Sequence, residues 1–597
     1  MNGSWLRVAI GALAVLGGQD SADRASFAVW AVHDGVKVKR DDRAHPERAR
    51  NAVWDGRTIR LVAARNEIVA FQVIVEAGDH AVDDLSARLP ALRHTRGSEI
   101  AYRPPATDPT DYRQRPIQVF SEHYMEVTRA SRATWVFRPD SPAAPKEALG
   151  WIPVQLVPEN ATRGRGGFPL RVEANRNQAF WFDVYVPRAI ASGVYRGTVQ
   201  INARGGGRTL PIELEVVDVQ LPDENTLPAM VYYQGSQPEL YHGRNLDPAY
   251  HRFAKRHRIE FVHAYNPITA HAALDRLTGR DFTADRGYEG PGEGTPNRIV
   301  PRTFYGPGQD FASPEAVWKA ADEWMDFVDE HLPHARTFLY MPDEPRPPQF
   351  PQIVALGERL ESNPGNGRRL PTLVTRGYAP ELAGIIDIWC AGPLHYDLEH
   401  AKREQAAGKE YWFYNGGRPA GGAIVIDSHA TDARVVGWAA FKHAADGYFY
   451  WHGVHWRHNN QKKIGDRNQD VWGNPITFDN RSEEKSDNGF INGDGVLVYP
   501  GEEKLHPAQD RGNAGPISTI QMANLRRGLQ DHVILTLARR QGLEREIAAE
   551  IARLVPRVFS DATPAEIGFS EHGNDYEEAR RRLLRAIAQL ASAAKTP

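Results

Sequence analysis

The periodicity of apolar residues changes at residues 221–228, LPDENTLP, and this change constrains the fold more than any other feature. Before it, apolar and polar residues alternate as they do in strands; after it, helical patterns alternate with short apolar runs. Two prolines around a polar run are typical of a linker. The sequence therefore predicts a β-rich part followed by an α/β part.

The β-rich part contains several runs of strand-like alternation. Examples are FQVIVEA (71–77), AFWFDVYVP (179–187) and TVQINARGGGRTLPIELEVV (198–217). In the last of these, glycines 205–207 stand where a hairpin must turn, because glycine tolerates positive φ. Many short strands with Gly and Pro between them indicate a β-sandwich, which we assign to residues 25–222.

The clearest helix of the α/β part is SPEAVWKAADEWMDFVDEHLP (313–333), with Ser313 as its N-cap and Pro314 in its first turn. Apolar runs such as IIDIWC (385–390), EYWFYNG (410–416) and DGYFYW (446–451) read as strands. Strands that alternate with helices predict parallel strands with crossover helices. We expect a (β/α)8 barrel over residues 223–545 and further helices over 546–597, hence a multidomain α/β plus β protein.

The N-terminal residues bear on the cellular location of the protein, and its composition bears on its binding partners. Residues 1–24 resemble a signal peptide, with an apolar and small stretch over 8–18, so we expect export; without such a signal the protein would be cytoplasmic. The stretch is too short for a membrane span. With 72 basic and 75 acidic residues there is no basic excess for nucleic acid. The single cysteine, Cys390, ends an apolar run and is expected to be a buried structural thiol.

Two adjacent carboxylates, Asp343 and Glu344, end the apolar run in FLYMPDEPRPP (338–348). Neighbouring carboxylates raise each other's cost of ionisation, so the pair is either a solvated turn or a functional site. In a parallel barrel the functional side chains gather at the C-terminal ends of strands. Neighbours within a strand point to opposite faces, but Pro345 ends the ladder and lets the backbone turn both side chains into the barrel mouth.

Several motifs together make the chain resemble glycoside hydrolase family 123 and its relatives carrying the DUF4091 domain, whose characterised members are β-N-acetylgalactosaminidases. The motifs are FAVWAVHDGVKVKRDD (27–42), LVAARNEIVAFQVIVEA (61–77), WFDVYVPRAIASGVYRGTV (181–199), YMPDEP (340–345), YWFYN (411–415), GYFYW (447–451), NGDGVLVYPG (492–501) and LRRGLQD (525–531). The resemblance implies a β-sandwich followed by a (β/α)8 barrel. It also implies hydrolysis of β-linked N-acetylhexosamine, N-acetylgalactosamine in particular. We expect no cofactor.

The resemblance also implies roles for the carboxylate pair. Glu344 would be the general acid/base, and Asp343 would orient the substrate's 2-acetamido group as it attacks the anomeric carbon to form an oxazolinium ion, with net retention. The physical chemistry agrees, because two residues on one strand end cannot easily straddle a glycosidic bond as the carboxylates of other glycosidases do. A charged Asp343 would also favour the protonated form of Glu344. Where relatives commonly have Arg and Glu, this chain has Gln521 and Ala523.

Other residues at apparent strand ends are candidates for sugar contacts, with packing in the barrel as the alternative. They are Tyr265, Asn266, Tyr414, Asn415, Trp451 and Asp494, the last of which could instead cap its Gly-Asp-Gly turn. Two long stretches, about 277–312 and about 452–516, predict loops that wall the site. The histidines of WHGVHWRH (451–458) lack a fixed helical spacing and predict a solvated or sugar-contacting rim rather than a zinc site.

Two alternatives to a substrate-assisted enzyme stay open. The first is a glycosidase of another sugar that uses Glu344 as acid and a distant carboxylate, Asp387 or Asp397, as nucleophile. The second is a carbohydrate-binding protein without catalytic activity. In each case the expected partner is a glycan or oligosaccharide.

Overall fold

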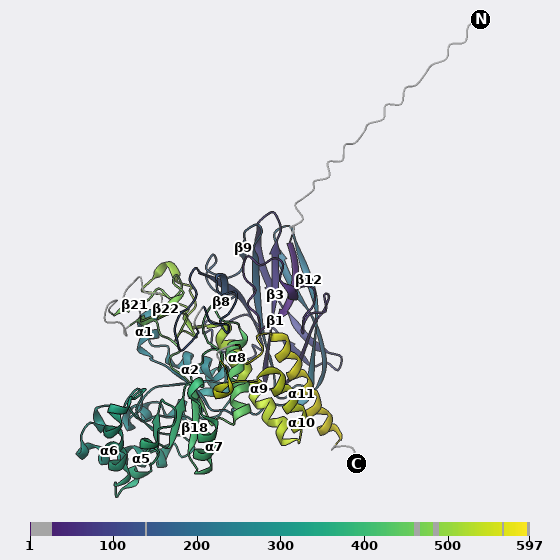
Figure 1. The fold of residues 1–597 in the computed structure, drawn as a ribbon. Helices are drawn as coiled ribbons and strands as arrows, with labels where there is room; N and C mark the ends of the chain where they lie inside the picture. Colours follow the sequence, from purple (N-terminus) through teal and green to yellow (C-terminus); the bar gives the residue numbers. More distant parts are fainter. Residues whose placement is uncertain (2–26, 138–139, 459–465, 481–488, 564–565, 594–597) are drawn as a thin grey trace.

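The computed structural model describes residues 1, 27–137, 140–458, 466–480, 489–563 and 566–593. Apart from Met1, the predicted signal peptide lies outside the described residues. The chain builds two sheets first, then a parallel sheet with helices around it, and ends in helices α9, α10 and α11, which lie below the first two sheets in Figure 1.

The first two sheets pack face to face. One has the strand order β1-β3-β10-β7-β8-β25-β24. The other has the order β2-β12-β11-β4-β9, with β5 paired to β11 and β6 paired to β5. The bounds are β1 Phe27–His33, β2 Ile59–Arg65, β3 Glu67–Ala77, β4 Val82–Arg88, β5 Ala91–His94, β6 Glu99–Ala101, β7 Ile117–Val127, β8 Gly150–Pro158, β9 Leu170–Val172, β10 Asn177–Val186, β11 Gly193–Ala203, β12 Gly206–Gln220, β24 Tyr499–Pro500 and β25 Pro516–Thr519. Phe71 and Phe182, stacked with centroids 4.8 Å apart, share one core with Ile201 and Leu214 of the opposite sheet.

The predicted hairpin near residues 205–207 is present. Strands β11 and β12 pair in antiparallel register up to Ala203 and Gly206, and Gly205 in the turn has a φ of +84°. Two strands of the first sheet, β24 and β25, come from far along the chain. Strand β25 pairs with β8, so the segment after the parallel sheet returns to complete the sandwich.

The third sheet is entirely parallel and positions the candidate site. Its order is β14-β13-β19-β18-β17-β16-β15. The bounds are β13 Ala229–Tyr232, β14 Glu260–Val262, β15 Leu339–Tyr340, β16 Thr372–Val374, β17 Ile388–Ala391, β18 Glu410–Tyr414 and β19 Tyr448–Tyr450. Cys390 is fully buried within β17, as predicted, and burial raises the pKa of its thiol well above the ordinary value.

The predicted closed barrel of eight strands is not formed by regular strands in the described residues. The edges of the parallel sheet, β14 and β15, are linked by the irregular segment 298–303. Val300 and Arg302 of this segment each donate a backbone N–H, at 2.9 Å, to a carbonyl just before β15. On the other side the Glu260 carboxylate of β14 accepts the N–H groups of the segment's first residues. Pro301 has no N–H to offer, so a regular ladder cannot form there.

The helices alternate with the parallel strands and continue past them. Their bounds are α1 Ser236–His242, α2 Asp247–Arg256, α3 Pro267–Ala272, α4 Leu274–Leu277, α5 Pro314–His331, α6 Phe350–Glu361, α7 Leu398–Ala406, α8 Thr431–His443, α9 Ile520–Arg540, α10 Glu544–Leu554 and α11 Gly573–Ala593. Ser313 caps α5 as predicted, because its side chain accepts the N–H of Ala316. Among the described residues, no helix is both long and apolar enough to cross a membrane.

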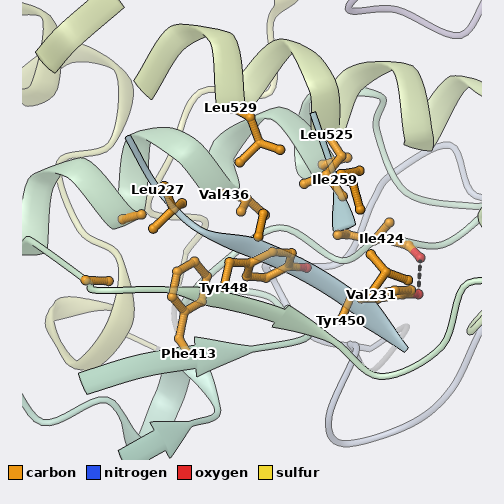
Figure 2. Packing of buried hydrophobic residues seen from close by; sticks show 14 of the residues in the cluster. Leu227, Val231, Ile259, Phe413, Ile424, Val436, Tyr448, Tyr450, Leu525 and Leu529 are labelled. Atoms are coloured by element: carbon orange, nitrogen blue, oxygen red, sulfur yellow. Dashed lines mark hydrogen bonds between the residues drawn. The ribbon is translucent and has the colours of Figure 1, made fainter. Parts of the chain in front are cut away.

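Helices α8 and α9 cover the sheet where β18, β19 and β13 meet. Figure 2 shows Leu525 and Leu529 of α9 above Val436 of α8, with Phe413 and Tyr448 of the strands beneath them. The dashed line in that view is the bond that the Tyr450 hydroxyl donates to the Ile424 carbonyl at 3.1 Å. This packing fixes the strands whose ends carry Tyr414 and Trp451.

Buried charges join the helices to the sandwich. Arg526 of α9 makes a bidentate pair with Asp183 of β10, with both N···O distances 2.7 Å. Arg527 donates to Glu67 of β3 at 3.1 Å and contacts Asp34 at 2.8 Å. Each of these side chains is almost completely excluded from solvent, so the ion pairs lie in the interface itself.

Candidate functional site

A cavity of about 1230 Å³ opens at the C-terminal ends of the parallel strands. Residues from the ends of β15, β16, β17, β18 and β19 contribute to its wall. Six of the candidate site residues predicted from the sequence line this cavity. They are Asp343, Glu344, Tyr414, Asn415, Trp451 and Asp494. The predicted long stretches also reach it, through Tyr305 of the first and Phe478 of the second.

The backbone turns sharply at the carboxylate pair. Strand β15 ends at Tyr340, and Glu344 adopts a φ of +41°, in the left-handed region that non-glycine residues seldom occupy. The Glu344 N–H donates to the Thr375 hydroxyl oxygen at 2.9 Å, which holds this conformation. Because the chain leaves the strand geometry here, the neighbouring side chains of Asp343 and Glu344 both line the cavity.

Asp343 is oriented by two hydroxyl groups. The hydroxyls of Tyr340 and Thr375 each donate to Oδ1 at 2.8 Å, whereas Oδ2 has no hydrogen-bond partner within the described parts of the chain. Burial and the nearby Asp343 raise the pKa of Tyr340 well above the ordinary value, so its phenol stays a donor. Asp343 thus has one carboxylate oxygen, Oδ1, that already accepts two hydrogen bonds, and a second, Oδ2, that can accept a hydrogen bond from a bound molecule.

Glu344 is held by Tyr414, the last residue of β18. The Tyr414 hydroxyl donates to Oε1 at 2.6 Å. Burial, followed by the Glu344 charge, raises the pKa of Tyr414, so this phenol also stays protonated. In the described residues Oε2 has no partner. The carboxyl group is therefore fixed through one oxygen while the other can exchange a proton with a bound molecule.

Trp451, Asp494 and Asn415 form another part of the wall. Asp494 Oδ1 accepts the Trp451 indole N–H at 2.8 Å and the Tyr450 hydroxyl at 3.2 Å. Burial raises the pKa of Asp494 to about 6, although these donors oppose the rise, with a smaller contribution from Trp135. Asn415 accepts the backbone N–H of Trp451 at 3.0 Å. Asn415 and Asp494 therefore position Trp451 as well as lining the cavity.

Tyr265 and Asn266 are not brought to this cavity. Asn266 is the N-cap of α3 and accepts the N–H of Thr269, which in turn bonds back to the Asn266 backbone. The Tyr265 side chain is buried, and its hydroxyl accepts a bond from Arg276 at 3.0 Å. These two residues follow β14 as predicted, but they lead into helix α3 instead of lining the cavity.

The two carboxylates considered as separate nucleophiles are placed differently. Asp387 accepts from the backbone and hydroxyl of Thr372 and does not line the cavity. Asp397 does line it, as the N-cap of α7. The backbone N–H of His400 lowers the pKa of Asp397, with a further contribution from the His400 ring, so this carboxylate is ionised near neutral pH.

The three histidines after β19 do not form the predicted solvated rim. His452, His455 and His458 are buried, with neighbouring ring centroids 5.3 Å and 5.8 Å apart. Burial lowers the pKa of all three, that of His455 to about 3, so they pack as neutral aromatic rings. Among the described residues, no group of three or more His, Cys, Asp or Glu side chains is placed to hold a metal ion.

Four further residues at the cavity were not singled out from the sequence: Tyr305, Tyr340, Thr375 and Trp135. Tyr340 and Thr375 stand at the ends of β15 and β16, so the strand-end rule could have indicated them. Tyr305 lies in a predicted wall loop. Trp135 comes from the segment between β7 and β8 of the sandwich, and no local pattern marks it as a cavity residue.

Comparisons with known proteins give one match to a family model and one match of overall fold. Residues 372–538 match the family model described as "Glycoside hydrolase 123, catalytic domain". The solved structure of a family 123 glycoside hydrolase from Clostridium perfringens, studied for glycolipid glycan hydrolysis, is similar with a TM-score of 0.59 and 12% identity. That match covers 96% of this chain and 99% of the other. No curated protein matches the sequence.

A second solved structure shows much less likeness. A β-glucuronidase from Parabacteroides merdae gives a TM-score of 0.23 at 12% identity, covering 62% of this chain and 47% of the other. With its TM-score of 0.59, the Clostridium structure is informative about the fold, and the family model about the matched residues. The matched range includes Thr375, Tyr414, Trp451 and Asp494, and it begins after the carboxylate pair.

Proposed function

We propose that the protein hydrolyses β-linked N-acetylhexosamine, N-acetylgalactosamine in particular, because residues 372–538 match the family model of the glycoside hydrolase 123 catalytic domain. The proposed reaction proceeds with net retention through an oxazolinium ion formed by the substrate's own acetamido group. The observation that carries this proposal is the arrangement of Asp343 and Glu344 on one strand end, each with one oxygen held and one oxygen available.

Glu344 is the general acid and then the general base in this proposal. The Tyr414 hydroxyl fixes Oε1 at 2.6 Å, so Oε2 can deliver a proton to the glycosidic oxygen and later accept one from water. A positioned donor on one oxygen restricts the rotation of the carboxyl group, and correct orientation is a large part of catalysis. Tyr414 acts here as a positioning residue.

Asp343 acts on the acetamido group. Its Oδ1 is occupied by the hydroxyls of Tyr340 and Thr375, so Oδ2 can accept the acetamido N–H. A carboxylate at that N–H turns the acetamido oxygen towards the anomeric carbon and stabilises the positive charge that develops as the oxazolinium ring closes. The leaving-group oxygen takes the Glu344 proton in the same step.

A second candidate reaction is supported by Asp397. This ionised carboxylate also lines the cavity, so it could serve as the nucleophile of a retaining glycosidase that acts on a sugar without an acetamido group. Asp387 supports no such reaction, because its side chain is bound to Thr372 outside the cavity.

Turnover of matched substrates distinguishes these reactions. We expect the purified protein to hydrolyse aryl β-N-acetylgalactosaminide, and to be inhibited tightly by an oxazoline-mimicking thiazoline, because that molecule resembles the proposed intermediate. Aryl β-N-acetylglucosaminide and the plain aryl β-galactoside serve as comparison substrates. Turnover of the plain galactoside alone would contradict the substrate-assisted mechanism.

Three variants assign the roles. We expect Glu344→Gln and Asp343→Asn each to lower kcat by about a hundredfold or more, in the range of a lost general acid or a lost charge stabiliser. Asp397→Asn is the matched control, because it removes a carboxylate from the same cavity; we expect its kcat to stay near that of the wild type. A loss of kcat in Asp397→Asn with little change in Asp343→Asn would favour the second candidate reaction.

A further inference from the structure

Trp135 exposes a large apolar surface at the candidate site, and the mechanism above does not use it. Its side chain is 44% exposed and lines the same cavity as Asp343 and Glu344. We propose that Trp135 is a stacking platform for a second sugar ring, the one linked to the N-acetylhexosamine that is cleaved. This inference rests on the proposed function and deepens it, since it makes the N-terminal sandwich part of the substrate site.

Hydrogen bonds hold the segment that carries Trp135 against the α/β part of the chain, which follows residue 222. At its start, Ser131 donates its backbone N–H and its hydroxyl to the two oxygens of Asp427, at 2.5 Å and 2.7 Å. After Trp135, the Val136 carbonyl accepts the backbone N–H of Arg418 at 2.8 Å. The loop is therefore anchored on both sides of Trp135, and the indole does not have to be ordered when a ligand binds.

The exposure of Trp135 contrasts with the burial of its neighbours. Val136 and Phe137 pack into a small apolar core with Val425, and both are nearly excluded from solvent. A chain that buries these two residues could bury the tryptophan as well, yet it directs the largest side chain of the segment into the cavity. A large aromatic side chain that is exposed to solvent in the same cavity as the proposed catalytic carboxylates indicates contact with a ligand rather than packing.

Aromatic rings continue from Trp135 along the cavity wall. Trp135 meets Phe478 edge to face with centroids 5.8 Å apart, and Phe478 meets Trp451 in the same way at 5.7 Å. Asp494 and Asn415 lie beside Trp451 and supply hydrogen-bonding groups. Sugars have apolar C–H faces and polar edges, and a wall of rings with a few polar groups complements both.

The size of the cavity agrees with more than one bound ring. Its volume of about 1230 Å³ is larger than the roughly 300–1,000 Å³ typical of sites for drug-sized ligands. The carboxylates after β15 and the tryptophan of the sandwich line this same large cavity, so a ligand long enough to fill it can contact both. An oligosaccharide has this property, whereas a single N-acetylhexosamine lacks the additional ring.

The test compares substrates of different length. Wild type and Trp135→Ala would be assayed on methyl β-N-acetylgalactosaminide and on a trisaccharide with the same terminal residue linked to two hexoses. We expect Trp135→Ala to lower kcat/KM for the trisaccharide about tenfold, mainly through KM, the effect of losing one well-packed aromatic contact. The methyl glycoside, which has no second ring, should change by less than about twofold.

Two further variants separate stacking from folding. Trp135→Phe keeps an aromatic face and should restore most of the trisaccharide kcat/KM. Leu149→Ala removes another exposed apolar side chain of the same β7–β8 connection, 51% exposed and outside the cavity, and should behave as wild type. Equal losses on both substrates, or no loss on either, would overturn the inference. If the wild type hydrolyses neither substrate, the proposed function fails, and the inference that rests on it fails with it.

Discussion

The Thr375 hydroxyl has two hydrogen-bonding functions at the carboxylate pair. It accepts the Glu344 N–H at 2.9 Å and donates its own proton to Asp343 at 2.8 Å. The left-handed backbone of Glu344 costs on the order of 1–3 kcal/mol and persists only where its surroundings hold it. One side chain at the end of a neighbouring strand thus determines both the turn of the backbone and the orientation of the carboxylate.

We therefore predict that Thr375→Val lowers kcat about tenfold or more while KM changes less, because a misplaced carboxylate affects the transition state most. Valine keeps the shape of threonine and removes only the hydroxyl. Thr375→Ser restores the hydroxyl and should recover most of kcat. Steady-state kinetics on the aryl N-acetylgalactosaminide measure both. A Thr375→Val enzyme with wild-type kcat would show that the hydroxyl does not position the pair.

At the scale of elements, helix α8, which packs on the parallel sheet, crosses the C-terminal helix α9 in close backbone contact. A Cβ atom on Gly437 of α8 would lie 1.9 Å from the carbonyl oxygen of Gly528, and one on Gly528 would lie 2.4 Å from the Arg434 carbonyl. The two backbones therefore touch, and only glycine fits at the crossing. Since α8 connects β18 to β19, this contact also determines where Tyr414 and Trp451 lie.

Gly528→Ala is predicted to lower the free energy of unfolding by about 1–3 kcal/mol, because the helices must separate to admit the methyl group. Gly384→Ala is the matched control: a Cβ there would have no atom within 4 Å, so its unfolding free energy should stay near that of the wild type. Urea unfolding followed by circular dichroism measures both. An equally stable Gly528→Ala protein would contradict the backbone contact.

For the whole molecule, the charges between sandwich and helices bind the two parts together. Burial alone would raise the pKa of Asp183, but Arg526 more than offsets this and holds the pKa below its ordinary value. A depressed pKa means that the ionised carboxylate stabilises the folded state at neutral pH. That contribution is fully present above the pKa of the unfolded chain and is lost as the pH falls through the lower pKa of the folded chain.

Accordingly, Asp183→Asn should lower the free energy of unfolding near neutral pH by about 3–5 kcal/mol, because Arg526 is left buried without its partner. The difference from wild type should shrink as the pH falls below about 4, the ordinary range of an aspartate, towards the lowered pKa of the folded chain. Glu399→Gln, which breaks an exposed pair with Lys402, is the control and should change stability by at most about 1 kcal/mol. A pH-independent difference for Asp183→Asn would contradict the assigned pKa direction.

The sequence predicts those features that depend on local chemistry. The cap at Ser313, the hairpin at Gly205 and the strand ends carrying Tyr414 and Trp451 all follow from patterns of a few residues. The irregular segment 298–303 was not predicted, since it depends on how Glu260 and Pro301 meet across the sheet edge. Trp135 could not be predicted either, because its place at the cavity depends on contacts with residues about 290 positions away, such as Asp427.

Strands β24 and β25 have a consequence for any attempt to handle the part after residue 222 by itself. They follow the parallel sheet in the chain but are built into the first sheet of the sandwich, through the pairing of β25 with β8. Excising the segment after residue 222 would leave these strands without a template and expose the β-edge they normally complete. The part after residue 222 is thus not a transferable module, and grafting it onto another protein would require the sandwich to be transferred with it.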